Sequence, residues 1–323
     1  MEWKSFFDSV SLAKKRSEKL WLVIFFDIII CSFRYSAGYN DYIEFEFFLM
    51  NHAQRLTYLT APRSMAIAKK YNEPASTALL LDKSKLYNYY SPFISRDFLN
   101  LKTADANDLE NFIRKHKKVM FKVFDGNSGD GITKFDYDGN QEVDFVKLYD
   151  KLIVNKQFLI EEYFVQHSKI GELSPTSVNS IRMVTFIDDY KVPHLITSAL
   201  KIGVGGYIDN IGQGGLYTIL SDEGVVVAPF INKQGDHVVI HPITNMELIG
   251  FKVPNFKHVK NQIMKVSMVL PNTRYVGWDI SINQNGDLEI IEGNPFTGPF
   301  QLPASLAENK QGILPKLSQY MSQ

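Results

Sequence analysis

The sequence predicts an α+β protein with two lobes behind an N-terminal helical region, and three observations support this fold class. Residues 1–75 place apolar side chains at helical spacing. From Ser177 onward, alternating strand patterns dominate. The chain has 323 residues, enough for two or three packed lobes rather than one core. We therefore expect a helical region over 1–78, a first lobe over 79–165 and a second lobe over 166–323.

Composition limits the function classes. Lys+Arg and Asp+Glu both number 35, so the formal net charge is zero and no global field marks a nucleic-acid binder. Any phosphate chemistry must therefore use locally placed lysines and arginines. The single cysteine, Cys31, excludes an internal disulfide and a cysteine-based zinc site. It also fits a reducing compartment, so we expect a cytoplasmic protein.

One strongly apolar segment, residues 20–33, follows the basic run at 14–16. Asp27 interrupts it, and it is shorter than the roughly 20 residues that cross a bilayer. No small-residue cleavage site follows it, as a signal peptide would require. We expect a buried helix in a helical cap. The alternative is contact with a membrane surface, because an aromatic-rich apolar segment beside basic residues can lie at an interface.

Two lysines of the first lobe are candidates for phosphate contact. Lys83 follows a short apolar run that opens a helix, although an ordinary surface lysine is the simpler interpretation. Lys122 lies within a strand, where a lysine is costly to bury without a partner such as a polyphosphate. The loop after it has glycines at 126, 129 and 131, which let backbone N–H groups approach phosphate oxygens. A simple turn is the alternative.

An amphipathic helix over 144–155 leads to a strand over 158–166 that leaves the first lobe. Glu161, Glu162 and Phe164 occupy the expected hinge between the lobes. Backbone groups there can recognise the edge of an adenine while apolar side chains cover its faces.

In the second lobe, two expected strands over 179–186 and 195–202 carry Arg182 and Lys201. Between residues 203 and 215, six of 13 positions are glycine, which is typical of a mobile loop or of a surface shaped around a ligand. The flanking basic residues favour the ligand. His241 is a candidate acid or base, and a structural or ligand-positioning histidine is the alternative that we favour.

Residues 275–299 predict a hairpin whose turn is Asn285-Gly286. Glu292 and Asn294 then share one face of the second strand, and antiparallel pairing can bring Asp279 beside them. Oxygen side chains of this kind bind hard cations such as Mg²⁺. A polar strand end with solvated acids is an equally weighted alternative.

The order of these features resembles the ATP-grasp fold, in which two α+β lobes hold ATP between them. Over residues 40–315 it is most similar to the sugar-transfer-associated ATP-grasp family, which is met among bacterial surface-polysaccharide genes. The motifs that carry the resemblance are 175–182 (PTSVNSIR), 208–210 (IDN) with 214–216 (GGL), 241–242 (HP), 277–279 (GWD) and 291–294 (IEGN).

The resemblance implies a role for each matching residue. Lys122 and Lys83 would contact the α- and β-phosphates, and the loop 126–131 would cover the triphosphate. Arg182 and Lys201 would face the transferring phosphate. The remaining implied sites are the loop residues Gly126, Ser128, Gly129 and Gly131, the adenine hinge Glu161, Glu162 and Phe164, the magnesium ligands Asp279, Glu292 and Asn294, and the substrate motifs Asp209, Asn210, Gly214, Gly215 and His241.

The chain departs from the family pattern at one position. Many ATP-grasp ligases have an arginine two residues before the metal-binding aspartate, where this chain has Gly277. Stabilisation of an oxyanion would then be left to Arg182. The departure bears on the ligase assignment rather than on ATP binding.

The activity implied by the resemblance is that of an ATP- and Mg²⁺-dependent ligase that joins an amine or amino acid to a sugar acid through an acyl phosphate. One alternative is a phosphotransferase that acts on a sugar hydroxyl, with Asp209 or His241 as the base. Another is a non-catalytic nucleotide-binding partner of membrane-bound glycosylation machinery, associated with the membrane or a glycosyltransferase through the N-terminal helices. The expected ligands are small molecules rather than nucleic acid.

Overall fold

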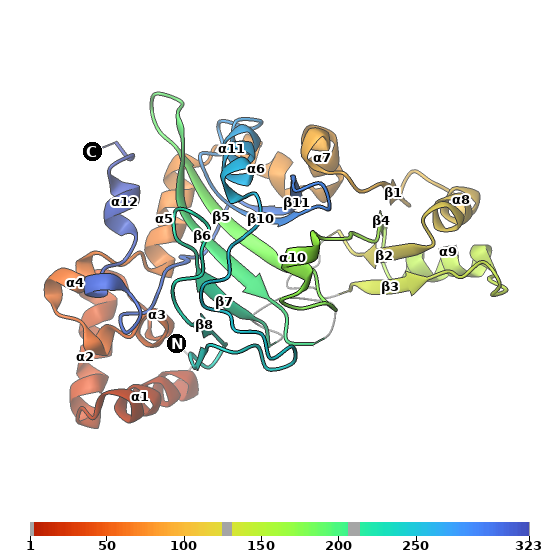
Figure 1. The fold of residues 1–323 in the computed structure, drawn as a ribbon. Helices are drawn as coiled ribbons and strands as arrows, with labels where there is room; N and C mark the ends of the chain where they lie inside the picture. The colour runs from red at the N-terminus through yellow and green to blue at the C-terminus, as the bar shows by residue number, and fades with distance from the viewer. Residues whose placement is uncertain (1–2, 125–130, 206–213, 323) are drawn as a thin grey trace.

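The computed structural model describes residues 3–124, 131–205 and 214–322, and within them it confirms an α+β fold with N-terminal helices (Figure 1). The helices are α1 (Trp3–Ser17), α2 (Trp21–Tyr35), α3 (Tyr39–Glu44), α4 (His52–Leu56), α5 (Ala61–Tyr71), α6 (Pro74–Leu81), α7 (Lys83–Tyr89), α8 (Ala106–His116), α9 (Phe145–Val154), α10 (Ser168–Gly171), α11 (Phe256–Ser267) and α12 (Leu314–Ser318), with 3-10 turns η1 (Phe47–Leu49), η2 (Ser91–Phe93) and η4 (Glu308–Lys310). The strands are β1 (Phe98–Asn100), β2 (Lys118–Lys122), β3 (Thr133–Asp136), β4 (Leu159–Glu162), β5 (Ser180–Ile187), β6 (Pro193–Ile202), β7 (Leu216–Ile219), β8 (Phe230–Ile231), β9 (His237–Val238), β10 (Tyr275–Ile282) and β11 (Leu288–Asn294).

The small lobe contains an antiparallel sheet of four strands in the order β1-β4-β2-β3, as far as the described residues show. Helices α8 and α9 supply its core, and each begins at an aspartate, Asp105 or Asp144, whose side chain accepts hydrogen bonds from the first turn. Alternate residues of β2, Val119 and Phe121, are buried against these helices. Lys122 is the last residue of β2, and Figure 1 shows the small lobe projecting from the main body.

The second sheet has the order β11-β10-β5-β6-β7-β8-β9 within the described residues, again with antiparallel pairs. One face packs on α11 and on segments around it, and Ile181, Met183 and Ile280 belong to that core. Because side chains alternate along a strand, Arg182 and Asp279 point to the opposite face. The pattern of the sequence thus separates a core face from a polar face on the same strands.

Helices α6 and α7 pack on the large sheet rather than within the small lobe. Leu80 lies against Gly293 of β11, and Leu86 and Tyr90 join the core of the large sheet. The sequence assigned residues 79–90 to the first lobe. Leu80, Leu86 and Tyr90 pack with the second lobe, whereas the ring of Tyr87 packs on Phe98 of β1 in the first. Their apolar spacing does not identify which sheet they cover.

The N-terminal helices correct one expectation. The apolar segment 20–33 does form a helix, α2, but only Ile24, Ile28, Cys31 and Tyr35 are buried. Its opposite face is exposed, so the segment is half-buried rather than buried. No described helix combines the length and the apolar character that a bilayer crossing requires.

Asp27, the charge that interrupts this segment, points inward. Both of its carboxylate oxygens accept hydrogen bonds from Arg55, at 2.7 and 2.6 Å, and Tyr42 donates a third at 2.8 Å. This buried ion pair joins α2 to α4. It explains how a charge is tolerated in an apolar helix.

The chain after β11 returns to the N-terminal helices. Gln301 donates to the carbonyl of Leu59 at 2.6 Å, and the backbone N–H of Ser305 donates to the Glu46 carboxylate at 2.8 Å. The Ala304 N–H donates to the carbonyl of Phe45 at 3.2 Å. The segment from 295 to 312 is therefore held between the polar face of the large sheet and the helical region.

Candidate functional site

The β10–β11 hairpin brings three predicted site residues together. Asp279 pairs directly with Glu292, and Gly277 pairs with Asn294, as the alternation predicted. The turn forms at the predicted place. Gly286 has a φ of +86° there, a backbone conformation that favours glycine. In the orientation that satisfies its amide, Asn294 donates to Glu292 at 2.9 Å.

Arg182 and Lys201 both bind Asp279. The Arg182 guanidinium donates Nε–H and Nη2–H to the two carboxylate oxygens at 2.8 and 2.7 Å, a paired geometry. The Lys201 ammonium lies 2.9 Å from one of them. Burial alone would raise the pKa of Asp279, but Arg182 and Lys201 outweigh it and hold that pKa well below its usual range. Asp279 is therefore a fully ionised carboxylate that already has two cationic partners.

The absence of a side chain at Gly277 has a steric explanation. A Cβ at this position would clash with Thr297 and would lie 3.0 Å from Cδ of Arg182. Arg182 also donates to the Thr297 hydroxyl at 3.2 Å and stacks 4.9 Å from the centre of the Phe300 ring. The space above β10 is thus filled by an arginine that comes from β5.

A second charged cluster joins the small lobe to the large sheet. Arg96, between η2 and β1, binds Glu161 of β4 at 3.2 Å and Glu289 of β11 at 2.5 Å. Glu161 also accepts hydrogen bonds from Tyr87 and from the Lys122 ammonium, the latter at 2.5 Å. The side chains of Arg96, Glu161 and Glu289 are almost completely buried. Lys122 therefore has a carboxylate partner in the absence of any ligand.

Burial moves both members of the Lys122–Glu161 pair toward their neutral forms. It raises the pKa of Glu161 to about 8, with the charge of Glu289 adding to the effect and Lys83 opposing it. Burial likewise lowers the pKa of Lys122, together with Arg96 and Lys83, while Glu292 opposes that shift. Lys83 and Glu292 thus lie close enough to act on this pair electrostatically. Of the predicted site residues, Lys122, Lys83, Glu161 and Glu292 therefore act on one another electrostatically.

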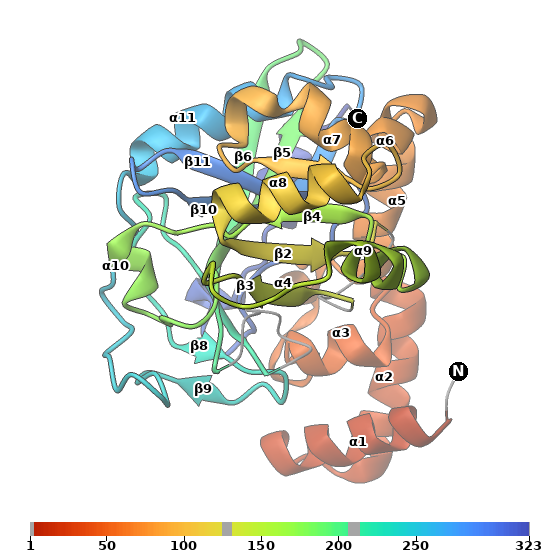
Figure 2. The ribbon, with the colours of Figure 1, turned by 90° about the vertical axis from the view of Figure 1, so that its right-hand side faces the viewer.

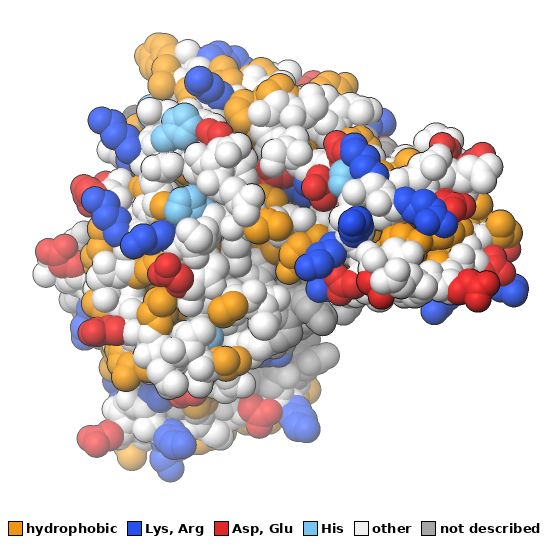
Figure 3. All heavy atoms as spheres, turned by 45° about the vertical axis from the view of Figure 1, so that its right-hand side comes forward, with side chains coloured by type: hydrophobic (Ala, Val, Ile, Leu, Met, Phe, Trp, Pro, Cys, Tyr) orange, Lys and Arg blue, Asp and Glu red, His pale blue; other side chains and the backbone are white. Residues whose placement is uncertain are grey.

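A cavity of about 140 Å³ lies between the two sheets at this cluster. Lys122, Arg96 and Glu161 line its polar part, and Met120, Ile132, Phe164, Val178 and Ile291 line its apolar part. Its volume is below the roughly 300 Å³ of the smallest usual ligand pockets. It therefore suits one flat apolar group of a larger ligand, with the rest lying in the open cleft, beside which basic side chains are visible on the small lobe (Figure 3).

Glu162 points differently from the neighbouring Glu161. Its carboxylate accepts from the Asp97 N–H at 3.1 Å and lies 3.5 Å from His116. Its own N–H donates to the carbonyl of Asp97 at 2.9 Å. Glu162 borders the cavity, but its side chain is engaged with β1 and α8.

Of the predicted loop residues, the described ones have local structural roles. Gly131 has a φ of +74° and Gly214 one of +97°, and Gly215 is buried at the start of β7. His241 is fully buried, its Nε2–H donates to the Gly203 carbonyl at 2.9 Å, and its Nδ1 accepts from Ile243 and Thr244. It thus positions the base of the glycine-rich segment rather than reaching a substrate. Gly126, Ser128, Gly129, Asp209 and Asn210 lie outside the described residues.

The sequence did not indicate four residues of the site, Arg96, Glu289, Thr297 and Phe300. Glu289 stands in an apolar strand, so the argument applied to Lys122 would have marked it as needing a buried partner. Nothing local marks Arg96, Thr297 or Phe300, which lie in connecting segments.

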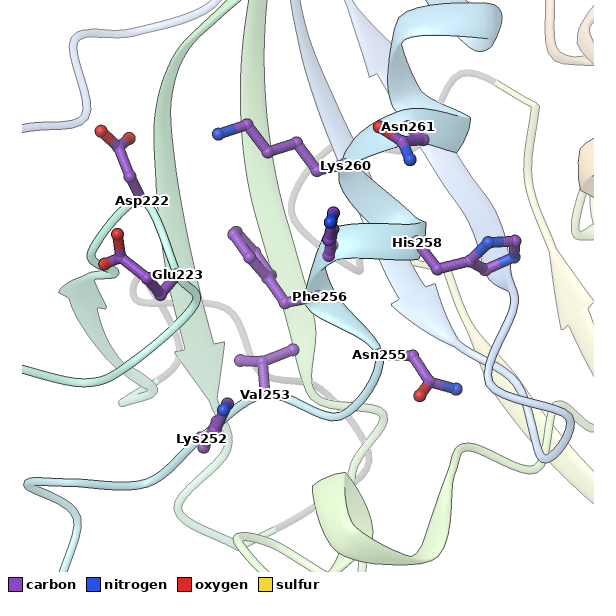
Figure 4. A pocket seen from close by; sticks show the side chains of 10 residues that line it. Asp222, Glu223, Lys252, Val253, Asn255, Phe256, His258, Lys260 and Asn261 are labelled. Carbon is purple, nitrogen blue, oxygen red and sulfur yellow. The ribbon is translucent and has the colours of Figure 1, made fainter.

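A larger open pocket of about 670 Å³ lies elsewhere, between the turn after β7 and the first turns of α11 (Figure 4). Figure 4 shows Asp222, Glu223 and Lys260 at its rim, with Phe256 and Val253 between them. None of the predicted site residues lines it. We therefore place the candidate site at the smaller cavity between the sheets.

Comparison with solved structures finds remote similarity to ligases. The ATP-grasp ligase PsnB, in a structure with minimal precursor, Mg and ADP, is 13% identical with a TM-score of 0.39, over 78% of this chain and 63% of that one. D-alanyl-alanine synthetase A from Vibrio cholerae O1 biovar eltor str. N16961 is 12% identical with a TM-score of 0.46, over 77% and 66%. D-alanine–D-alanine ligase from Bacillus anthracis is 12% identical with a TM-score of 0.42, over 73% and 65%.

The chain spans less than two thirds of the length of each of these three solved proteins. No curated protein sequence matches it. The model of one family, described as sugar-transfer associated ATP-grasp, matches residues 63–320, most of the chain. This match confirms the resemblance inferred from the motifs: the chain belongs to the sugar-transfer associated ATP-grasp family.

Proposed function

We propose that the protein is an ATP- and Mg²⁺-dependent ligase that joins an amine or amino acid to a sugar acid in surface-polysaccharide synthesis. One observation carries the proposal. Lys122 of β2 lines the cavity together with Ile291 of β11, the residue before Glu292, and the charge of Glu292 favours the protonated form of Lys122. The triphosphate of a nucleotide requires cationic side chains on one side and metal-binding oxygens on the other. Membership of the family supports a sugar-linked substrate.

The donor set fits magnesium. Asp279, Glu292 and Asn294 offer the oxygen ligands that a hard cation prefers. When bound, Mg²⁺ would neutralise and align the β- and γ-phosphates. Arg182 now contacts Asp279 and lies 3.2 Å from the Asn294 oxygen, so these two ligands become available only when Arg182 withdraws.

A triphosphate supplies the reason for Arg182 to move. Its negative charge competes with Asp279 for the guanidinium, which binds phosphate in the same two-pronged manner as a carboxylate. Arg182 would then face the transferring phosphate, with Lys201 beside it. Lys122 and Lys83 would hold the other phosphates, and Phe164 would cover the base.

In the proposed reaction, a carboxylate oxygen of the acid attacks the γ-phosphorus, the bond to ADP breaks, and an acyl phosphate forms. The amine nitrogen then attacks the acyl carbon. Phosphate leaves with the bonding electrons, and the nitrogen gives its proton to solvent. The residues of this chain position the reactants and stabilise charge, and none forms a covalent intermediate.

The direct test is loss of turnover on removal of the acidic ligands. Asp279→Asn combined with Glu292→Gln should abolish magnesium-dependent ADP release, measured with a panel of acids and amines and by the mass of the product. The matched control is Glu142→Gln with Asp150→Asn, two exposed acids of the small lobe, which should retain full turnover. Persistent activity in the first variant would place the metal elsewhere.

The same panel separates the alternatives. A stable phosphomonoester formed from a sugar without any amine would replace the ligase by a phosphotransferase. That reaction usually needs a general base, and His241 is enclosed and engaged on both ring nitrogens. Nucleotide binding without turnover, together with an unchanged biological effect of Glu292→Gln, would favour the non-catalytic scaffold.

A further inference from the structure

Helix α2 has two apolar faces, and the residues that the structure describes cover only one of them. Ile24, Ile28, Cys31 and Tyr35 are buried. The other face is solvent-exposed, with exposed fractions of 63% for Leu22, 51% for Val23, 58% for Phe26, 52% for Ile30 and 88% for Phe33. At 100° per residue these five positions fall within about 100° of arc, so they form one continuous stripe. Single exposed apolar residues are ordinary, but a contiguous stripe marks an interaction surface.

Helix α1 extends this surface. Trp3 and Phe7, one turn apart, are 62% and 41% exposed. Their rings stack on each other at 6.1 Å, and Phe7 stacks on Trp21 of α2 at 6.1 Å. The aromatic contacts join the two helices into one surface, defined by Trp3, Phe7, Leu22, Val23, Phe26, Ile30 and Phe33 and called here the α1–α2 surface. Figures 1 and 2 place both helices at the edge of the molecule, away from the small lobe.

The charge around the α1–α2 surface is positive. Residues 3–35 contain six Lys or Arg and three Asp or Glu, in a chain whose formal net charge is zero. Lys4, Lys14, Lys15 and Arg34 are exposed. Lys14 lies seven and eleven positions after Phe7 and Trp3, two spacings that place all three on one side of α1.

Asp27, the one acidic residue inside the apolar segment 20–33, does not point to the α1–α2 surface. Asp27 is bound by Arg55 and Tyr42 within the helical region. Its charge is compensated there and does not oppose an anionic partner. Apolar and aromatic side chains beside exposed lysines are the pattern of helices that lie in a membrane interface. A second protein copy would need no surplus of positive charge, so lipid is the occupant that the observations favour.

We propose that the α1–α2 surface docks on an anionic lipid bilayer, with the two helices lying in the interface plane and exposed lysines contacting lipid phosphates. This proposal does not rest on the proposed function, because it involves no residue of the cavity. Its physical terms are burial of aromatic and aliphatic side chains and attraction of basic residues to the surface.

The test is flotation of the full chain with vesicles. We expect binding to vesicles of phosphatidylcholine containing phosphatidylglycerol, and much weaker binding to pure phosphatidylcholine. Phe26→Glu with Phe33→Glu should reduce the partition coefficient at least about tenfold, since each buried phenylalanine contributes about that factor or more. Lys14→Glu with Lys15→Glu should also reduce it, by about fivefold or more per residue.

The matched control is Val146→Glu with Val154→Glu, two exposed valines of α9, which should bind as the unaltered chain does. Circular dichroism and thermal unfolding of each variant check that the fold is retained. Absence of binding to anionic vesicles, equal binding to neutral ones, or an equal loss in the control pair would each overturn the proposal. So would a dimer in lipid-free solution that Phe26→Glu with Phe33→Glu converts to a monomer, because a second copy would then cover this surface.

Discussion

Two buried carboxylates of the candidate site, Asp279 and Glu161, lie on different sheets, and they differ in charge. Asp279 on β10 has its pKa held well below the usual range by Arg182 and Lys201, which outweigh its burial. Glu161 on β4 has its pKa raised to about 8, chiefly by burial. Their side chains are 11% and 4% exposed, so burial alone does not explain the contrast.

The difference lies in how many cations each carboxylate has to itself. Asp279 has both Arg182 and Lys201 to itself, whereas Glu161 has only Lys122 to itself and shares Arg96 with Glu289, a second buried acid. Removing a carboxylate from water disfavours its charge, and only dedicated partners restore it. On the large sheet, Asp279 therefore stays ionised. The Lys122–Glu161 pair differs, because burial favours the neutral form of both groups. An incoming phosphate would favour the protonated, charged form of Lys122.

The largest expected effect comes from neutralising each carboxylate in turn. Asp279→Asn should lower the free energy of unfolding by roughly 3–5 kcal/mol, because it leaves Arg182 and Lys201 buried without an anion. Glu161→Gln should cost less than this, because burial raises the pKa of Glu161 to about 8 and the amide of glutamine keeps one acceptor oxygen for the surrounding donors. Chemical denaturation at pH 7 measures both. Equal losses would show that the two carboxylates carry the same charge.

The next effect concerns nucleotide binding by Lys122. Lys122→Ala should weaken ATP binding by about 1.5–3 kcal/mol, because it removes a charge-assisted contact to phosphate. Isothermal calorimetry measures the change. Lys147→Ala on α9, a largely exposed lysine, should leave the affinity unchanged. Unaltered affinity in Lys122→Ala would contradict the assignment of this lysine.

The smallest effect is a pH dependence. Lys122 must be protonated to hold phosphate, so affinity is constant below its folded-state pKa and falls above it. Burial lowers that pKa, so the decline should begin well below the ordinary lysine value near 10.4. Between pH 7 and pH 9 we therefore expect ATP affinity to fall as the pH rises. Lys122→Arg should remove this decline, and a flat profile in the unaltered chain would argue against a lowered pKa.

The sequence predicted the parts of the site that depend on local patterns. Alternation in strands placed Asp279 opposite Glu292 and put Arg182 on the polar face of β5. The turn forms around Asn285-Gly286, where Gly286 has a positive φ, and a β-bulge between Asp279 and Ile280 then shifts the register so that Asp279 pairs with Glu292. These features follow from neighbours within a few residues or across one hairpin.

The features that the sequence missed depend on long-range packing. Arg96 joins β4 to β11 and is separated from its partner Glu289 by 193 positions along the chain, and no local signal marks it. The apolar pattern of α2 fits a helix covered on all sides and one covered on one side equally well. Likewise, the buried role of His241 required the position of Gly203 in space.

The return of residues 295–312 to the N-terminal helices has a practical consequence for fragment design. The family match begins at residue 63, after α4. A truncated protein cut at that boundary would lose Glu46 and Leu59, the partners of Ser305 and Gln301. The segment 295–312 would lose these two contacts, whereas the hydrogen bond from the Ser64 hydroxyl to the Thr297 carbonyl would remain. The boundary of sequence similarity is therefore a poor guide to where a working domain starts.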